Sequence, residues 1–272
     1  MSSPAPLSIF DSGIGGLSVL REVRRQLPDE RLLFLADQAH VPYGPRPLEE
    51  VRDFAEAISA YLISQGAKLI VVACNAASAA ALHHLRQVFP QIPFVGMEPA
   101  VKPAAEHTHS GVVGVLATPA TFQGALYASV LERFARGVTV LQDTCPGLVG
   151  QIEAGEINSP ETRQILEQAL HPMLAAGIDT VVLGCTHYPF VIPLIQEIAG
   201  DSVRVIDPAP AVARQVERVL KSHNLLYENN FQVSVRYLTT GDATRLGSML
   251  SALVGSDGTA EHIDWDTIRK ES

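Results

Sequence analysis

Short, continuous apolar runs divide this chain at intervals, and their spacing leaves few folds open to it. They lie at residues 7–10, 31–36, 69–73, 94–96, 112–116, 138–141, 180–183 and 203–206. Runs rich in Val, Ile and Leu are typical of parallel strands buried on both faces, and the stretches between them have helical periodicity. Gly66 and Gly177 each shortly precede a strand, where the C-cap of a helix is expected. The pattern predicts an α/β fold.

The number of runs is too large for one compact nucleotide-binding half, so two α/β domains are expected. Residues 68–75 (KLIVVACN) resemble residues 179–186 (DTVVLGCT), and residues 9–12 resemble residues 115–118 more weakly. A repeat of this kind predicts two similar domains that face each other across one cleft.

The domain boundaries are expected at two turn-forming pairs, Glu98-Pro99 and Asp207-Pro208. The first domain would hold residues 1–98 and 207–272, and the second would hold residues 99–206. Hinge motion between the domains would admit and enclose a substrate. The polar tail after Gly255 is expected to be peripheral.

Charge and composition exclude several classes of function. The formal net charge is −9, and clustered Lys and Arg are lacking, so nucleic acid is not an expected partner. No apolar run reaches the roughly 18 residues of a membrane span. The first residues lack the basic and apolar regions of a secretory signal, so a cytoplasmic protein is expected.

The chain has three cysteines, Cys74, Cys145 and Cys185. An odd number argues against a disulfide framework, and the absence of a CxxC pair argues against a zinc ribbon. His, Asp and Glu show no metal-ligand spacing, and none of the four lysines lies in a segment that resembles a pyridoxal phosphate site. Neither a metal nor a cofactor is therefore predicted.

Cys74 and Cys185 each end a predicted strand and precede a polar residue and a helical pattern. Ligands of open α/β sheets bind at this end of the strands. A helix N-terminus would lower a thiol pKa below its ordinary value of about 8.5, and would offer N–H donors to a carboxylate. A cysteine among Val and Ala is often only a small buried hydrophobe. Two in equivalent positions favour catalysis, whereas Cys145 is expected to be structural.

Residues 11–16 (DSGIGG) follow the first strand, and glycines there would let the backbone approach a ligand closely. The dinucleotide pattern GxGxxG is not met, because Ser18 stands where its third glycine should be, and the P-loop lysine is also lacking. We expect Asp11 and Ser12 to point into the cleft; the alternative is a tight turn capped by one of them.

Two further features are candidates for chemistry. The loop Val41-Pro-Tyr-Gly-Pro45 would present backbone donors and the Tyr43 hydroxyl. His187 stands two residues after Cys185, where it would orient the thiolate or donate a proton to it.

Taken together, these segments resemble the aspartate/glutamate racemase family, and its glutamate racemases in particular. The resemblance covers nearly the whole chain, in the same order and at similar spacing. It is carried by residues 10–16 (FDSGIGG), 41–44 (VPYG), 74–78 (CNAAS), 117–121 (ATPAT), 184–189 (GCTHYP) and 239–242 (TTGD). The resemblance implies two pseudo-symmetric, doubly wound (flavodoxin-like) domains, each with a mostly parallel central sheet, and an active site in the cleft between them.

The same resemblance implies a function. It is the interconversion of L- and D-glutamate without cofactor or metal, which supplies D-glutamate for bacterial peptidoglycan, by a homodimer. Cys74 and Cys185 would be the acid/base thiols on opposite faces of the substrate, assisted by Asp11, Glu153 and His187. The residues that would bind substrate are Asp11, Ser12, Tyr43, Gly44, Asn75, Ala76, Thr121, Thr186 and His187.

This chain departs from the family at residue 76, where alanine replaces the usual threonine, and at Gly124, where a serine is common. One lost neutral hydrogen bond at residue 76 would weaken binding by roughly 0.5–1.5 kcal/mol. The alternatives left open are a racemase for aspartate or another acidic amino acid, a non-catalytic binding protein on the same scaffold, and a redox dithiol protein.

Overall fold

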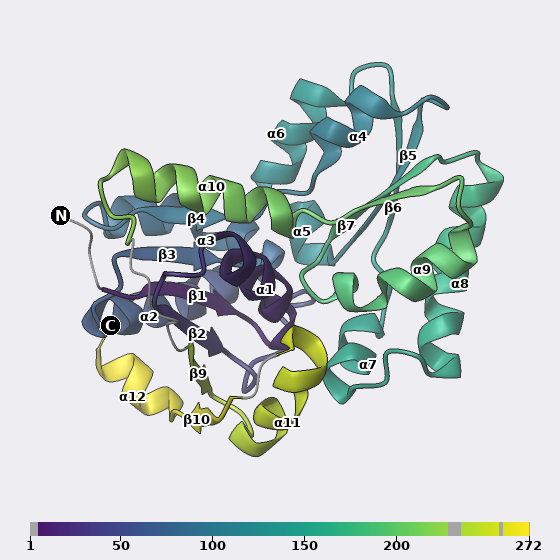
Figure 1. Cartoon of the computed structure of the whole chain (residues 1–272). Helices are drawn as coiled ribbons and strands as arrows, with labels where there is room; N and C mark the ends of the chain where they lie inside the picture. The colour runs from purple at the N-terminus through teal and green to yellow at the C-terminus, as the bar shows by residue number, and fades with distance from the viewer. Residues whose placement is uncertain (1–4, 228–234, 256–257, 272) are drawn as a thin grey trace.

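The computed structural model describes residues 5–227, 235–255 and 258–271. Its strands form two sheets (Figure 1), one of six strands in the order β10-β9-β2-β1-β3-β4 and one of four in the order β6-β5-β7-β8. The strands are β1 (Leu7–Asp11), β2 (Leu32–Ala36), β3 (Leu69–Val72), β4 (Phe94–Gly96), β5 (Val112–Ala117), β6 (Thr139–Asp143), β7 (Thr180–Gly184), β8 (Arg204–Ile206), β9 (Val235–Thr239) and β10 (Ala260–His262). Every pairing between them is parallel.

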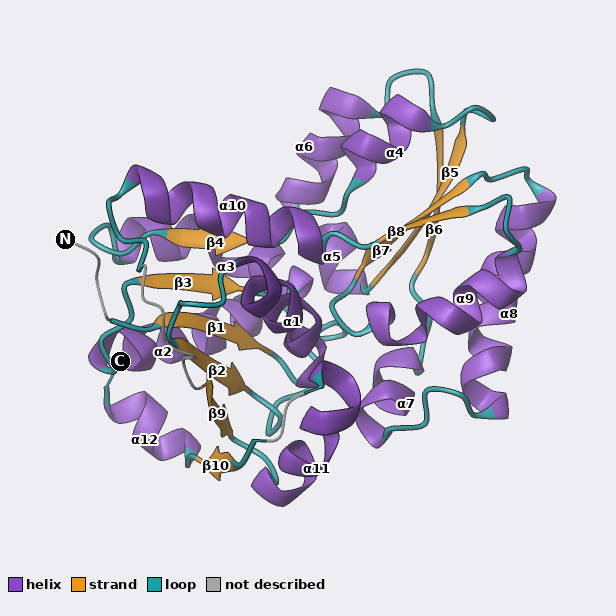
Figure 2. Cartoon of the chain, viewed as in Figure 1, coloured by secondary structure: helices purple, strands orange, loops and turns teal. Residues whose placement is uncertain are grey.

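Helices lie on both sides of each sheet (Figure 2). They are α1 (Leu17–Gln26), α2 (Leu48–Ser64), α3 (Asn75–Val88), α4 (Val101–His107), α5 (Pro119–Gln123), α6 (Ala125–Phe134), α7 (Leu148–Ala154), α8 (Pro160–Ala175), α9 (Ile192–Ala199), α10 (Ala209–Ser222), α11 (Ala243–Val254) and α12 (Trp265–Lys270). Two 3-10 helices, η1 (Ile14–Gly16) and η2 (Tyr188–Val191), complete the set. Gly66 and Gly177 have φ values of +85° and +83° after α2 and α8, which confirms the predicted helix ends.

Each apolar run named above forms a strand, and the central strands separate two cores. Side chains of a strand point alternately to opposite faces. Leu69 and Val71 therefore join the core made with α1 and α10, whereas Ile70 and Val72 join the core made with α2 and α3. The prediction of burial on both faces is wrong for β6 and β8, the edge strands of the second sheet, which have a neighbour on one side only. No residue of β6 is fully buried, and β8 buries only Ile206.

The second sheet repeats the order of four strands in the first. The order β6-β5-β7-β8 corresponds to β2-β1-β3-β4, so β5 is equivalent to β1 and β7 to β3. Cys74 follows β3 and Cys185 follows β7, which places the two cysteines at equivalent positions. The predicted fold class, two doubly wound parallel sheets, is confirmed, and β9 and β10 extend the first sheet.

The chain passes from the first sheet to the second after β4 and returns after β8, through α10, which packs on α1. Glu98-Pro99 and Asp207-Pro208 lie on these two connections; the domain boundaries placed there stay a prediction. The tail after Gly255 is not peripheral: β10 pairs with β9, and Ile268 of α12 is fully buried. In the described part of the chain, no helix has the length and apolar character needed to cross a membrane.

Candidate active site

The carboxyl ends of strands from both sheets meet at one small pocket. Its lining comes from the segments after β1, β2 and β3 of the first sheet, from the segments after β5 and β7 of the second, and from one residue of α7. The residues are Ser12, Pro42, Tyr43, Gly44, Cys74, Asn75, Ala76, Thr118, Val149, Cys185, Thr186 and His187. The structure therefore brings both predicted thiols to the same pocket, one from each sheet, and all three cysteines are free.

Cys74 is the N-cap residue of α3, and its sulfur accepts a hydrogen bond from the backbone N–H of Ala77 at 3.5 Å. Its thiol points to Ser12 Oγ at 3.7 Å. Burial raises the pKa of the Cys74 thiol, and the negative charge of Asp11 raises it further; the two hydrogen bonds lower it without compensating. The expectation that the helix end would favour a thiolate is therefore wrong for Cys74, because the residue is only 6% exposed and burial outweighs the helix end.

Cys185 has a different environment. The element that follows Cys185 is not an α-helix but the 3-10 helix η2, which begins three residues later. Cys185 is therefore not the N-cap of a helix. Instead, Cys185 Sγ lies 3.8 Å from His187 Nδ1, and His187 Nε2 lies 2.6 Å from Glu153 Oε1. Burial opposes protonation of His187, but the hydrogen bonds and charges of Cys185 and Glu153 outweigh burial and raise its pKa. A protonated His187 can donate a hydrogen bond to a thiolate at Cys185.

Glu153 lies on α7 behind His187 and does not line the pocket. Its carboxylate also accepts hydrogen bonds from the backbone N–H of Ile14 at 2.8 Å and from Gln38 Nε2 at 3.1 Å. Burial opposes ionisation of Glu153, but its bond to His187 and these two donors outweigh burial and lower its pKa. A Cβ at Gly13 would overlap the Glu153 carboxylate. The glycines of residues 11–16 thus admit side chains of the second sheet, not only a ligand.

Asp11 is fully buried and is held behind the pocket, although we expected it to point into the cleft. Its carboxylate accepts hydrogen bonds from the backbone N–H of Gly13 at 3.0 Å and from Thr186 Oγ1 at 2.9 Å. The bond from Gly13 is the one expected of a tight turn capped by Asp11, which was the alternative. The bond from Thr186 connects the first sheet to the second. Burial raises the pKa of Asp11, and the charge of His187 and the hydrogen bonds only partly oppose it. Ser12 does line the pocket, beside Cys74.

The hydroxyl of Tyr43 is already engaged within the protein. It donates to Asp37 Oδ2 at 2.6 Å, and burial together with the Asp37 charge raises its pKa well above the ordinary value. The carbonyl of Gly44 accepts from the N–H of Ala120, in the second sheet's segment. Tyr43 and Gly44 therefore line the pocket, but the Tyr43 hydroxyl and the Gly44 carbonyl are already hydrogen-bonded within the protein.

The amide of Asn75 is buried, with the residue only 3% exposed, and neither its nitrogen nor its oxygen has a hydrogen-bond partner. Buried amides are rarely left unpaired, so this one is available to a ligand. Ala76, next to it, also lines the pocket, where it contributes a methyl group. Thr121 does not line the pocket; it bonds Thr118 Oγ1 at 3.2 Å.

Thr118 is therefore the lining residue of that segment, and the sequence reasoning missed it as a site residue. A signal was present, since residues 9–12 align with residues 115–118 and this places Thr118 opposite Ser12. Val149 and Pro42 were also missed. Among the residues that the structure describes, no group of three His, Cys, Asp or Glu side chains has an arrangement that would hold a metal ion.

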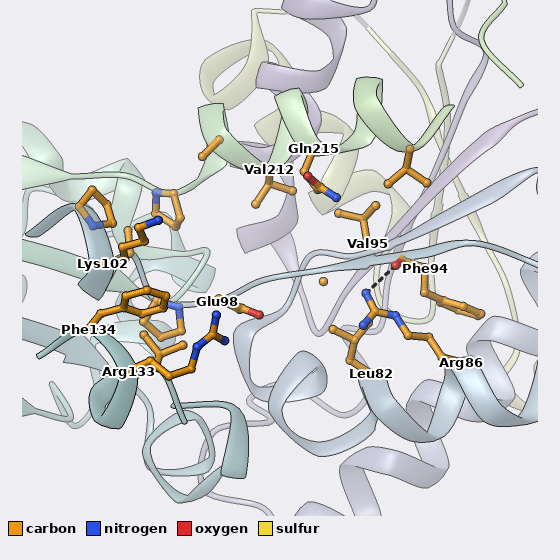
Figure 3. A pocket seen from close by; sticks show the side chains of 18 residues that line it. Leu82, Arg86, Phe94, Val95, Glu98, Lys102, Arg133, Phe134, Val212 and Gln215 are labelled. Carbon is orange, nitrogen blue, oxygen red and sulfur yellow. Dashed lines mark hydrogen bonds between the residues drawn. The ribbon is translucent and has the colours of Figure 1, made fainter. Parts of the chain in front are cut away.

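A second, larger pocket of about 470 Å³ lies away from the thiols, beside the two connections between the sheets. Figure 3 shows Glu98 and Arg133 on one side of it and Leu82 and Arg86 on another, with Gln215 of α10 above them. Arg86 donates to the carbonyl of Phe94 at 2.9 Å. No cysteine lines this pocket, so the two candidate acid–base thiols belong to the smaller one.

The fold and the smaller pocket define a class of protein: an α/β protein of two similar sheets, with a candidate acid–base site built on two buried thiols. The model of the family described as Asp/Glu/Hydantoin racemase matches residues 15–216. A glutamate racemase of Roseiflexus sp. (strain RS-1) is 54% identical over 252 residues, which cover 92% of this chain and 93% of that protein. This chain belongs to the Asp/Glu/hydantoin racemase family.

Solved structures agree with this assignment. The glutamate racemase of Francisella tularensis, in complex with D-glutamate, superposes with a TM-score of 0.84 at 26% identity, covering 97% of this chain and 99% of that one. The Escherichia coli glutamate racemase, in complex with L-glutamate, gives a TM-score of 0.83 at 31% identity, with 96% and 99% coverage. The similarity places the chain with the glutamate racemases of the family.

Proposed function

We propose that this protein interconverts L- and D-glutamate by proton transfer at Cα between Cys74 and Cys185. One observation carries the proposal: two buried, free thiols from equivalent strand ends line a single pocket, together with the unpaired amide of Asn75. The family and the substrates named for the two solved relatives support glutamate as the amino acid.

The proposed reaction has two proton transfers. The thiolate of one cysteine removes the Cα proton, and the thiol of the other delivers its proton to the opposite face, so that the roles of the two sulfurs are exchanged at the end. The Cα–H bond of an amino acid is very weakly acidic, and the negative charge that develops on the carboxylate needs fixed donors in a dry site. Asn75 and Ser12 are the lining side chains that offer such donors, whereas the hydroxyl hydrogen of Thr186 is already donated to Asp11.

The two sulfurs have different surroundings. The raised pKa of Cys74 favours its thiol, which is the acid in one direction, while His187 Nδ1 lies 3.8 Å from Cys185 Sγ, where it can donate a hydrogen bond to this sulfur when it acts as the base. For the reverse direction Cys74 must lose its proton. The ammonium group of the substrate brings a positive charge into the pocket, and a positive charge favours the thiolate.

The pocket between the thiols measures about 20 Å³. A cavity of this size holds roughly one water molecule, whereas pockets for small molecules measure about 300–1,000 Å³. The protein must therefore open to admit glutamate. We infer that the segments around the two sheets are domains, divided near residues 98 and 207, and that they separate about the two connections between them. Limited proteolysis with and without glutamate tests the division, which predicts that glutamate protects the cleft and that cleavage falls near these residues.

The decisive assay is exchange of the Cα proton in D2O, followed by NMR and by chiral chromatography of the product. Wild-type protein is expected to convert either enantiomer of glutamate and to incorporate deuterium at Cα. Cys74→Ala and Cys185→Ala are expected to abolish racemisation. Cys145→Ala is the matched control, because Cys145 is a buried free thiol outside the pocket lining. Racemisation by either single variant at the wild-type rate would overturn the two-thiol mechanism.

The methyl group of Ala76, in place of the family's usual threonine, is the observation that keeps aspartate as a second candidate substrate. The same assay with L-aspartate separates the two. Exchange with aspartate alone would overturn the assignment to glutamate.

The biological role follows from the same family membership. We infer that the product D-glutamate enters bacterial peptidoglycan synthesis, that the protein works in the cytoplasm, and that it is a homodimer. Depletion of the protein in its host, with D-glutamate added back to the medium, tests the first point. Sedimentation of the purified protein tests the last.

A further inference from the structure

The carboxylate of Glu153 is reached from both sides of the cleft. Glu153 and His187 follow strands of the second sheet, and they contact each other at 2.6 Å. The other two donors to the carboxylate, Ile14 N–H and Gln38 Nε2, follow β1 and β2 of the first sheet. The group that orients His187 is therefore itself held by the opposite side of the molecule.

Gln38 is fixed as a donor before it meets Glu153. Thr239 Oγ1 donates to Gln38 Oε1 at 2.8 Å, and the same hydroxyl accepts from the backbone N–H of Gly241 at 2.9 Å. Because the amide oxygen is already paired, the amide nitrogen faces the carboxylate. Gly241 leaves room for this arrangement, since a Cβ there would lie 2.7 Å from Gln38 Cβ.

Arg245 holds the backbone of the same residue. It lies in the first turn of α11, beside the first sheet, and its Nη2 donates to the carbonyl oxygen of Glu153 at 2.8 Å. Glu153 is the last residue but one of α7. Carbonyls of the last turn of a helix lack partners within the helix, and a cation there is favoured by the helix dipole.

We propose that Gln38 and Arg245 are positioning residues that lock Glu153 against His187 only when the two sides of the cleft are closed. The inference rests on the proposed racemase function. Opening of the cleft would withdraw Gln38, Arg245 and Ile14 from Glu153, so His187 would lose its fixed partner. Closure of the cleft would therefore enclose the substrate and orient His187 beside Cys185 at the same time.

The lock has a signature in the pH dependence. Two titratable groups face Glu153: His187 is in direct contact with it, and Asp11 interacts with it through its charge. The hydrogen bonds from Ile14 and Gln38 lower the pKa of Glu153 against the effect of burial. Loss of the Gln38 amide should raise this pKa, so the acid limb of kcat/KM should move to higher pH. Arg245 contacts only the carbonyl oxygen, so its loss should leave the limb in place.

The test compares Gln38→Leu, Arg245→Ala and Arg245→Lys with two controls. Gln142→Leu removes an exposed glutamine amide on β6 that bonds the hydroxyl of Tyr127 on α6, and Arg218→Ala removes an exposed arginine on α10. Gln38→Leu and Arg245→Ala should each lower kcat/KM by about 10- to 100-fold, the range of one hydrogen bond to a charged or helix-end group. Arg245→Lys should recover part of the loss, and the controls should match the wild type.

The two enantiomers of glutamate are equally stable in water, so kcat/KM must fall by the same factor in both directions. An unchanged kcat/KM in Arg245→Ala, or a lower kcat/KM in Gln38→Leu with an unmoved acid limb, would overturn the lock and leave the racemase function intact. A wild-type protein that does not exchange the Cα proton would overturn both. Thermal unfolding of each variant shows whether it is folded, and the exposed Arg245 provides a test that is independent of Gln38.

Discussion

Replacing Gly15 by alanine should disable the site without adding or removing any functional group. Gly15 lies in η1, against the segment that follows β7. A Cβ built on it would overlap His187 Nδ1, and would lie 2.5 Å from Thr186 Oγ1 and 2.7 Å from His187 Cε1. Ordinary contact begins at 3.4 Å. The His187 ring would therefore have to move by about 1 Å, a displacement that can cost about 100-fold in rate when it separates catalytic groups.

The same overlap should cost roughly 1–3 kcal/mol of stability, as overpacking of a dense interior does. For a chain of this size each 1 kcal/mol corresponds to about 2–4 °C in Tm, so Gly15→Ala should remain folded at assay temperature. Steady-state kinetics with both enantiomers of glutamate would give kcat/KM, and calorimetry would give Tm.

Gly150→Ala is the matched control. Gly150 lies inside α7 and has nothing within 4 Å of its would-be Cβ, so alanine there should be neutral in kcat/KM and stabilising by up to about 1 kcal/mol. If Gly15→Ala kept the wild-type kcat/KM, His187 would not be held by close packing against η1, and the reasoning would fail.

Three further outcomes are expected. Lys68→Met leaves the buried carboxylate of Glu30 without its counter-ion, because the side chains of this ion pair at 2.6 Å are only 3% and 1% exposed. Urea unfolding should show a loss of about 3–5 kcal/mol that the added Glu30→Leu largely restores, and an unrestored double variant would contradict this. The folded protein raises the pKa of the Cys74 thiol above the ordinary value of about 8.5. In the protein without substrate, Cys74 should therefore be alkylated more slowly at neutral pH than a free thiol, and the rate should rise above pH 8.5. The folded state then binds the proton more tightly than the unfolded chain, so the thiol's contribution to stability is lost as pH rises; fast alkylation at neutral pH would refute the raised pKa. Ala76→Thr should lower the KM for glutamate by up to about tenfold through one added hydrogen bond, and an unchanged or higher KM would show that the hydroxyl finds no partner.

Most of the fold follows from the local pattern of the chain. Buried parallel strands must be apolar on both faces, and the runs therefore mark them. The pattern of apolar runs does not reveal a strand that forms because it pairs with a neighbouring strand and not because its residues are apolar. β10 (Ala260–His262) has two polar residues and exists because it continues the first sheet beside β9. The exposure of β6 follows from its place at the sheet edge together with its polar residues Thr139, Gln142 and Asp143.

The site was only partly accessible from the sequence. Parallel strands bring their carboxyl ends to one edge, and the strand-end rule therefore predicted that Cys74 and Cys185 share one pocket, as they do; their catalytic role stays a prediction. The raised pKa of Cys74 was not foreseen, because burial is a property of the folded neighbourhood. The role of Gly13 was not foreseen either. Its neighbour Ile14 donates to Glu153 across 139 residues of chain, and no local pattern reveals such a partner.

The two connections between the sheets also limit how the molecule can move. A single covalent link would let one body swing, twist and tilt freely against the other. Two links that run close together, one after β4 and one after β8, line the same pocket through Glu98, Pro99 and Pro208, and in the proposed opening they would act as a pair of pivots. Rotation about the line through them would be easy, whereas twisting and sliding would stretch one link or the other. A body with one such degree of freedom would return to the same place each time it closed, so the two sulfurs on separate sheets would meet the same carbon at every proposed turnover.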